Sequence, residues 1–204
     1  MFGACLDTIK LCDLATFRRG SFPQPYGKLE WYDGEGAMPF VQVADVREDM
    51  KLVENTKQKI SMLAQPKSIF VPKGSVVVTL QGSIGRVAIT QYDCYMDRTL
   101  AVFESYKTEV NKTCFAYQLK YKFAKEAEVA RGVTIKTITK EEFSNFEIAK
   151  VPIELQNRFA AFVEQSDKSK FALLHSLIIT QELQKALSWK LCTFKKGRIY
   201  ADFY

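Results

Sequence analysis

A long segment without glycine or proline most strongly constrains what this chain can fold into. The segment runs from residue 153 to residue 192, and most of its residues favour helix. Apolar and small residues recur in it at alternating steps of four and three: Leu155, Phe159, Phe162, Ser166, Ser169, Leu173, Ser176, Thr180, Leu183 and Leu187. Neighbouring apolar residues widen this stripe: Val163, Leu174, Leu177 and Ile178. The heptad period predicts one helix of about 60 Å over residues 152–190, and such a helix needs a packing partner.

An alternative is a pair of shorter helices that fold back on the rest of the chain. The polar stretch 166–169 is where a break between them would fall. Residues 191–204 are aromatic and basic, and their sequence fits either an ordered cap or a frayed tail.

Residues 7–150 follow a different pattern, in which short strands are separated by turns. The segments 40–46, 67–90 and 98–105 carry the β-branched and aromatic residues of strands. Residues 114–131 predict a helix that ends at Gly132, and Thr139 with Glu142 forms a capping-box pattern between two short β-like pieces. The sequence therefore predicts an α+β fold with a β-rich globular part followed by a long, coiled-coil-forming helix.

Composition excludes several classes of protein. The charge is +6 with a pI of about 9.0, which mildly favours a polyanionic partner such as nucleic acid. Five widely spaced cysteines and a single histidine, His175, provide no zinc pattern, so we expect reduced thiols and no metal. No apolar run reaches the roughly 18 to 20 residues of a membrane span, and the N-terminus has no signal-peptide pattern. We expect a cytoplasmic protein that does not enter a membrane.

No catalytic set can be assembled from the sequence. His175 falls on the predicted helix, and the loop carboxylates are not paired as acid-base or two-metal chemistry requires: Asp45, Glu48, Asp49, Asp93 and Asp97. No phosphate-binding loop of the ATPase type occurs. We therefore predict a protein without catalytic residues and without a cofactor of its own.

The turn between residues 81 and 86 carries the main functional hypothesis. Its glycines, Gly82 and Gly85, fit a tight hairpin, because the residues after them favour a strand rather than a nucleotide-binding helix. The same turn also fits close approach to a DNA duplex, since small residues let backbone N–H groups reach phosphates. Each basic residue nearby, taken alone, is more typical of solvated surface. Together they give a predicted DNA-contacting set: Arg18, Arg19, Ser21, Gln42, Arg47, Gln81, Gly82, Ser83, Gly85, Arg86, Arg98, Arg131 and Lys136.

The order of these motifs resembles the specificity subunit of type I restriction-modification systems. The resemblance covers residues 7–190, and its most specific parts are GSVVVTLQGSIGRVAI and GVTIKTITKEEFSNFEIAKVPIELQ, followed by the long helix. It implies a target recognition domain over residues 1–151, which reads half of a bipartite DNA sequence. It also implies a spacer helix over residues 152–190 that docks methyltransferase subunits, and a tail over residues 191–204. S-adenosylmethionine, ATP and Mg²⁺ would then belong to the methyltransferase and restriction (translocase) subunits.

A full-length member of that family has two recognition domains and two long helices, whereas this chain has one of each. It fits a natural half-subunit, a truncated product or a fragment. Two copies packed antiparallel through the helix would restore the two halves and read an interrupted palindrome. The helix positions predicted for this contact are Leu155, Phe159, Phe162, Leu173, Leu177, Leu183 and Leu187. The alternative is a remnant or decoy that binds partner subunits without reading DNA.

Overall fold

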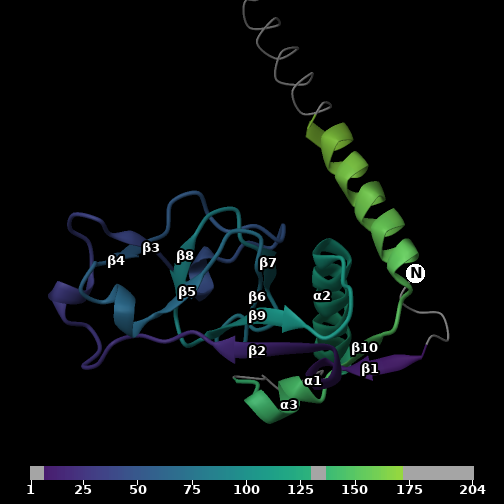
Figure 1. The fold of residues 1–204 in the computed structure, drawn as a ribbon, viewed down its shortest axis with the longest axis horizontal. Coiled ribbons are helices and arrows are strands. Elements are labelled where there is room, and N and C mark those ends of the chain that lie inside the picture. The colour runs from purple at the N-terminus through teal and green to yellow at the C-terminus, as the bar shows by residue number, and fades with distance from the viewer. Residues whose placement is uncertain (1–6, 130–136, 172–204) are drawn as a thin grey trace, which may run out of the picture. The chain divides into compact units, whose positions relative to one another are not determined.

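The computed structural model describes residues 7–129 and 137–171 (Figure 1). The chain divides into two compact units, Met1–Asn157 and Arg158–Tyr204. The first unit mixes strands and helices around packed cores, and the second continues the helix that begins at residue 153. The predicted α+β class is confirmed.

The first sheet has the strand order β2-β9-β6-β7, and all its neighbours are antiparallel. Its strands are β2 (Ala15–Arg19), β9 (Leu100–Tyr106), β6 (Val76–Thr79) and β7 (Val87–Ile89). All four residues of β6 are buried, because both faces of this strand are covered. Val76 and Val78 join one apolar core, while Val77 joins another on the opposite face. The hairpin predicted from the run of valines is confirmed.

Helix α2 (Lys112–Val129) covers one face of this sheet. Asn111 caps its N-terminus, since Asn111 Oδ1 accepts hydrogen bonds from the N–H groups of Thr113 and Cys114, at 3.1 and 3.3 Å. Phe115, Leu119 and Phe123 follow at steps of four and pack into the first core. This helix confirms the one predicted over residues 114–131 as far as Val129, and residues 130–131 and Gly132 lie outside the described residues.

The second sheet has the strand order β4-β3-β8-β5. Its strands are β4 (Gln58–Ile60), β3 (Met38–Val41), β8 (Cys94–Met96) and β5 (Ile69–Val71). Strands β3 and β8 are parallel, and the other pairs are antiparallel. Three short 3₁₀ helices complete this part: η1 (Leu29–Trp31), η2 (Val43–Asp45) and η3 (Gln65–Lys67). The strand expected over residues 40–46 is thus partly wrong, because the chain leaves the sheet after Val41 and coils into η2.

Two short helices and a two-stranded sheet complete the first unit. Helix α1 (Leu11–Leu14) lies between β2 and β1 (Thr8–Lys10), and β1 pairs with β10 (Glu147–Ala149). Helix α3 (Lys140–Ser144) buries Phe143 in the first core. The predicted capping box of α3 is confirmed: Thr139 Oγ1 accepts from the Glu142 N–H at 3.2 Å, and Glu142 Oε2 accepts from the Thr139 N–H at 2.8 Å.

The chain is helical without interruption from residue 153 to residue 171. The break suggested for residues 166–169 is wrong, because Ser166 and Ser169 donate their hydroxyls to carbonyl groups one turn earlier inside a continuous helix. The predicted helix is confirmed as far as residue 171, and Leu173, Leu177, Leu183 and Leu187 lie outside the described residues. Coiled-coil pairing stays a prediction. None of the described helices is long and apolar enough to cross a lipid bilayer.

Candidate nucleic-acid interface

Five chain segments that are far apart in the sequence meet at one edge of the two sheets. They are residues 19–21, 41–43, 80–83, 97–99 and 137–138, and we call them the loop cluster. Backbone hydrogen bonds connect them: Ser21 N to Met96 O, Asp97 N to Val41 O, Leu80 N to Thr99 O and Ile138 N to Leu80 O, all between 2.9 and 3.0 Å. The loop cluster is therefore one assembled surface of the first unit.

Gly20 makes the closest of these approaches possible. A Cβ atom at this position would lie 2.3 Å from the carbonyl oxygen of Met96 and 2.4 Å from that of Asp97. These are backbone atoms, so no side-chain movement could make room for it. The glycine after Arg18 and Arg19 therefore lets the end of β2 lie directly against the 97–99 turn.

The 97–99 turn is held by a buried carboxylate. Asp97 is 5% exposed, and its Oδ1 accepts hydrogen bonds from the Thr99 N–H at 3.0 Å and from the Thr99 hydroxyl at 2.6 Å. An aspartate that bonds the backbone two residues later fixes a tight turn. Arg98, at the tip of this turn, is exposed.

The hairpin turn confirms the conformational role predicted for its glycines. Gly82 and Gly85 have φ angles of 74° and 80°, in the region that favours glycine. A Cβ on Gly85 would also lie 2.7 Å from the Cβ and Cγ of Phe123 on α2. Gly85 therefore packs against the helix, while Gln81 and Gly82 belong to the loop cluster, in which Gln81 Nε2 donates to Thr137 Oγ1 at 3.4 Å.

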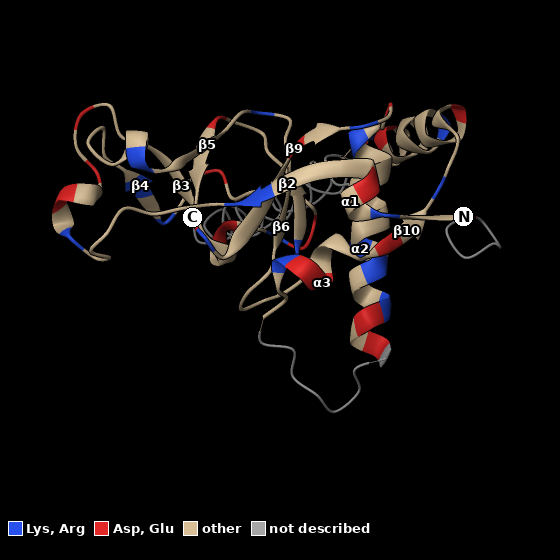
Figure 2. Cartoon of the chain, turned by 60° about the horizontal axis from the view of Figure 1, so that its bottom comes forward, with Lys and Arg blue, Asp and Glu red and all other residues tan. Residues whose placement is uncertain are grey.

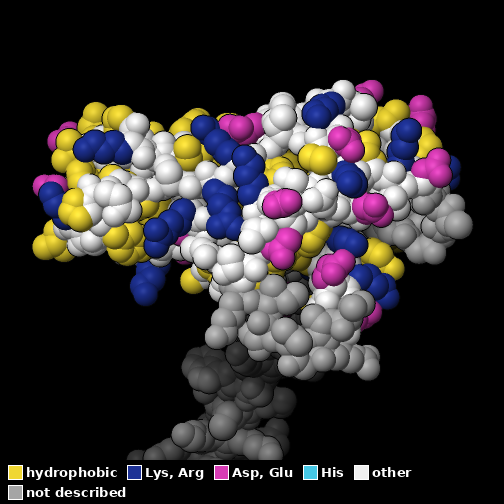
Figure 3. All heavy atoms as spheres, turned by 90° about the horizontal axis from the view of Figure 1, so that it is seen from below, with side chains coloured by type: hydrophobic (Ala, Val, Ile, Leu, Met, Phe, Trp, Pro, Cys, Tyr) yellow, Lys and Arg dark blue, Asp and Glu magenta, His cyan; other side chains and the backbone are white. Residues whose placement is uncertain are grey.

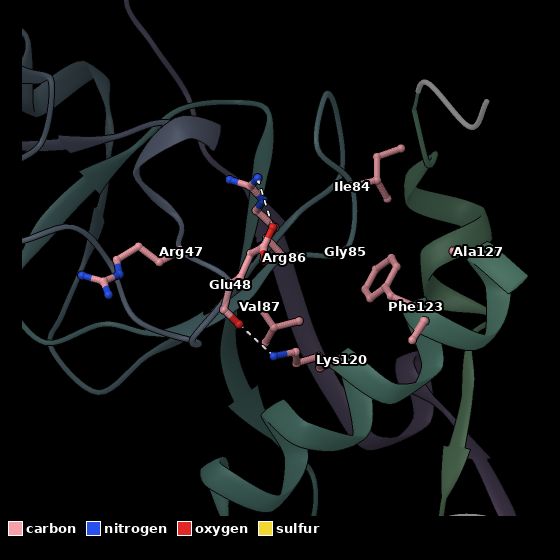
Figure 4. Close-up of a pocket in the computed structure, with 10 residues that line it drawn as sticks. Arg47, Glu48, Ile84, Gly85, Arg86, Val87, Lys120, Phe123 and Ala127 are labelled. Carbon is pink, nitrogen blue, oxygen red and sulfur yellow. Dashed lines mark hydrogen bonds and ion pairs between the residues drawn. The ribbon is translucent and has the colours of Figure 1, made fainter. Parts of the chain in front are cut away.

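Behind the hairpin lies a pocket of about 440 Å³, between residues 84–87, the 47–48 segment and α2 (Figure 4). Phe123 and Ile84 form its apolar wall. Its cations are already engaged: Arg86 Nη1 donates to the Val46 carbonyl at 3.2 Å, and Lys120 Nζ donates to the Glu48 carbonyl at 2.8 Å. These contacts brace the hairpin and α2 against the 46–48 segment.

The structure separates the predicted DNA-contacting residues into two groups. The loop cluster brings together Arg19, Ser21, Gln42, Gln81, Gly82, Ser83 and Arg98, with Arg18 beside them on β2. By contrast, Gly85, Arg86 and Arg47 line the pocket against α2. Arg131 and Lys136 lie outside the described residues.

Two arginines use their guanidinium groups within the fold. Arg19 Nη2 donates to the carbonyl of Ile138, which ties β2 to the segment before α3. Arg86 makes the contact with Val46 described above, and only a third of its side chain is exposed. Nothing in the local sequence distinguishes these two residues from the exposed arginines, because the carbonyl groups that they reach belong to distant segments.

Lys67 is a further cation that the sequence did not single out. It ends η3, where its carbonyl oxygen accepts a hydrogen bond from the Ser21 hydroxyl at 3.3 Å. Its Nζ lies 4.7 Å from the centroid of the Trp31 ring, a cation–π contact that leaves the residue exposed. The signal for its position is spatial, since only folding brings η3 to Ser21.

Positive charge gathers around this edge of the molecule. Figure 2 shows the end of β2 in blue, where Arg18 and Arg19 lie. Figure 3 views the molecule from below its orientation in Figure 1. Lys and Arg side chains gather near the middle of this face, with acidic side chains to one side of them. A surface of cations, amides and hydroxyls can bind phosphates and base edges.

The described residues contain no metal-ligand cluster, and the buried thiols are not nucleophiles. Burial raises the pKa of Cys94 to about 12 and that of Cys114 to about 11, so both stay protonated near neutral pH. Asp45 is also structural: it is 4% exposed, and its carboxylate accepts the N–H groups of Gln42 and Lys57 at 2.8 and 3.2 Å. The two thiols and the Asp45 carboxylate therefore serve the packing and hydrogen bonding of the fold.

Comparison with known proteins gives consistent results. A family model described as the type I restriction modification DNA specificity domain matches residues 6–184. A chain from a structure on complex assembly and conformational transition of the type I R-M system has a TM-score of 0.65 and 22% identity, over 92% of this chain and 44% of its own length. The HsdS subunit from Thermoanaerobacter tengcongensis gives 0.58 and 21%, over 86% and 40%. The type I S subunit from M. genitalium gives 0.54 and 15%, over 82% and 42%. This chain spans less than half the length of each of these structures, and the likeness shows the fold.

Proposed function

Because this chain belongs to the type I restriction modification DNA specificity domain family, we propose that its first unit reads DNA sequence with the loop cluster. The observation that carries the proposal is the convergence of Ser21, Gln42, Gln81 and Arg98 from four separate segments onto one surface. Amide, hydroxyl and guanidinium groups are the ones that read base edges in the major groove. Arg18 and Lys67, at its margins, would contact phosphates.

We further propose that the chain is the non-catalytic member of its complex and acts in the cytoplasm. Methyl transfer from S-adenosylmethionine and ATP-dependent cleavage would be performed by methyltransferase and restriction subunits. Two observations support this division. Backbone N–H groups hold the buried carboxylates of Asp45 and Asp97, and the buried thiols of Cys94 and Cys114 stay protonated. The proposed boundaries are a recognition domain over 1–151, a helix over 152–190 and a tail over 191–204.

The helix would dock those subunits and pair two copies of the chain. Phe162 is 67% exposed and Leu155 is 38% exposed in the described part of the helix, and apolar side chains at this spacing favour a helical partner. Replacing Phe162 with Asp should abolish dimers in sedimentation or capture of the methyltransferase subunit. The matched control is Lys168→Ala, which removes only a surface ion pair with Glu164. A monomer that also ignores the methyltransferase would contradict this part of the proposal.

The test of DNA reading is a salt-dependent binding assay on the full chain with a library of random duplexes. We expect selective enrichment of one motif, and an affinity that falls as salt rises, because phosphate contacts release counterions. Lys67→Ala should weaken binding to all sequences and reduce the salt slope by about one. Lys150→Ala is the control, since this exposed lysine follows β10, away from the loop cluster. Capture of partner subunits without any DNA binding would instead indicate a decoy.

A further inference from the structure

The arginines of the first unit differ in whether they already have a partner. Within residues 7–129 and 137–157, four of them hold a carboxylate or a carbonyl oxygen: Arg18 with Glu104, Arg19 with Ile138, Arg47 with Asp49, and Arg86 with Val46 and Glu48. Arg98 is exposed and makes no hydrogen bond or ion pair with the described residues. A ligand can therefore use its donors without breaking a contact to the described residues.

Arg98 also stands on a fixed base. The Asp97 carboxylate closes the turn beneath it, and the backbone on each side is bonded to a different segment, Asp97 N to Val41 O and Thr99 O to Leu80 N. Gly20 packs against the carbonyl groups of Met96 and Asp97 from a third side. A side chain on a fixed turn loses little backbone freedom on binding, and this favours a specific contact.

The surroundings of Arg98 indicate which DNA group it meets. The segments bonded to its turn carry uncharged side chains, Gln42 and Gln81, while the neighbouring cations Arg18 and Lys67 lie on β2 and η3. Amides next to a free guanidinium match base edges, and an arginine fork pairs best with O6 and N7 of guanine.

We propose that Arg98 is a specificity-determining residue that reads a guanine through the major groove, and that Asp97 is its positioning residue. This inference rests on the proposed function. The paired arginines then act differently: Arg19 and Arg86 stabilise the loops, and Arg18 contacts phosphate after releasing Glu104.

The test compares the full wild-type chain with Arg98→Ala by selection from random duplexes. We expect a wild-type motif with an invariant guanine, and an Arg98→Ala motif in which only that position is relaxed. Discrimination against the other bases there should fall by about ten- to a hundred-fold. The melting temperature should not change, because Arg98 makes no polar contact with the described residues. Arg18→Ala is the contrasting variant, with a weaker affinity for all sequences and the same motif.

A modified base provides the sharper readout. Replacing the selected guanine by 7-deazaguanine removes the N7 acceptor, which should weaken binding by wild type but not by Arg98→Ala. Asp97→Ala should relax the same position while Asp97→Asn, which keeps an acceptor oxygen, should largely retain it.

Three outcomes overturn the inference. An Arg98→Ala variant that is weaker on every duplex would show a phosphate contact, and one with the wild-type motif would remove Arg98 from the readout. In both cases sequence-selective binding by wild type leaves the proposed function standing. A wild-type chain without sequence-selective binding would overturn both.

Discussion

The two sheets of the first unit bury very different cores. The first sheet packs against α2 and α3 through a network of aromatic rings, in which Phe103 and Phe115 meet edge-to-face with centroids 4.8 Å apart. The second sheet has a core of its own that is confined to Phe22, Trp31, Phe40, Ile60 and Ala64. Around it, large apolar side chains stay exposed: Tyr26, Leu29, Met62, Leu63 and Phe70. Figure 3 shows hydrophobic side chains gathered at this end of the molecule.

The difference in core size suggests different roles: the first sheet is the stable support, and the second sheet presents loops. A third core lies between the sheets, where Val77 and Val102 of the first meet Val41 and Met96 of the second. The loop cluster lies at the same junction, because β3, β8 and the β6–β7 hairpin all end there. We infer that the first sheet fixes the position of the loop cluster, while the second supplies part of its side chains.

The largest expected effect comes from removing one buried aromatic ring from the core of each sheet. Phe115 and Phe40 are both fully buried. Phe115→Ala should cost about 3–5 kcal/mol of unfolding free energy, because the cavity would lie in the core that supports the whole unit. Phe40→Ala removes the same group from the small core, so the second sheet should open locally before the first unfolds.

Hydrogen exchange and denaturant unfolding distinguish these two outcomes. After Phe40→Ala, faster exchange should be confined to residues 22–41 and 58–71, with the exchange of β6 and β9 retained. After Phe115→Ala, exchange should rise in every strand. Equal, global loss of protection in both variants would show that the two sheets are one cooperative unit.

The junction between the sheets is tested by Gly20→Ala. The new Cβ would overlap two backbone carbonyl oxygens, so β2 and the 97–99 turn must separate. We expect a loss of about 1–3 kcal/mol, typical of overpacking, together with weaker DNA binding. Gly74→Ala is the control, because that position has open space and only a strained φ of 79°. If Gly20→Ala binds DNA as well as Gly74→Ala does, the close approach at Gly20 does not support the reading surface.

Sequence patterns predicted the elements whose determinants are local. The β6–β7 hairpin follows from its valines and two glycines, α2 from a run of helix formers, and the α3 cap from Thr139 and Glu142, three residues apart. The alternation of Val41 and Val43 predicts that the strand continues through segment 43–45, whereas buried Asp45 accepts backbone N–H groups and holds a 3₁₀ turn.

The candidate site was predicted as a set of residues but not as an arrangement. Arg19 and Arg86 have the same local signature as Arg98, yet Arg19 bonds the Ile138 carbonyl 119 positions away. The parallel pairing of β3 with β8 and the contact of Ser21 with Lys67 also join distant segments. Which arginine stays free therefore depends on tertiary packing, which no single stretch of sequence encodes.

The smallest expected effect concerns the cap of helix α3, which packs against the first sheet, and it depends on pH. Hydrogen bonds from the Thr139 backbone N–H and hydroxyl lower the pKa of Glu142. Since the folded state favours the carboxylate, this contribution is present above the unfolded pKa of about 4.3 and is lost as pH falls through the lower, folded pKa. Glu142→Gln should therefore flatten the fall of stability in this acid range, as measured by denaturant unfolding at several pH values. Thr139→Ala, which removes the cap hydroxyl, should cost about 1 kcal/mol at neutral pH.

Glu141→Gln is the control for Glu142→Gln, because it removes one carboxylate from the same helical turn without removing the capping contact. Identical profiles of stability against pH for the two glutamine variants would mean that net charge, rather than the capping contact, causes the loss of stability in acid.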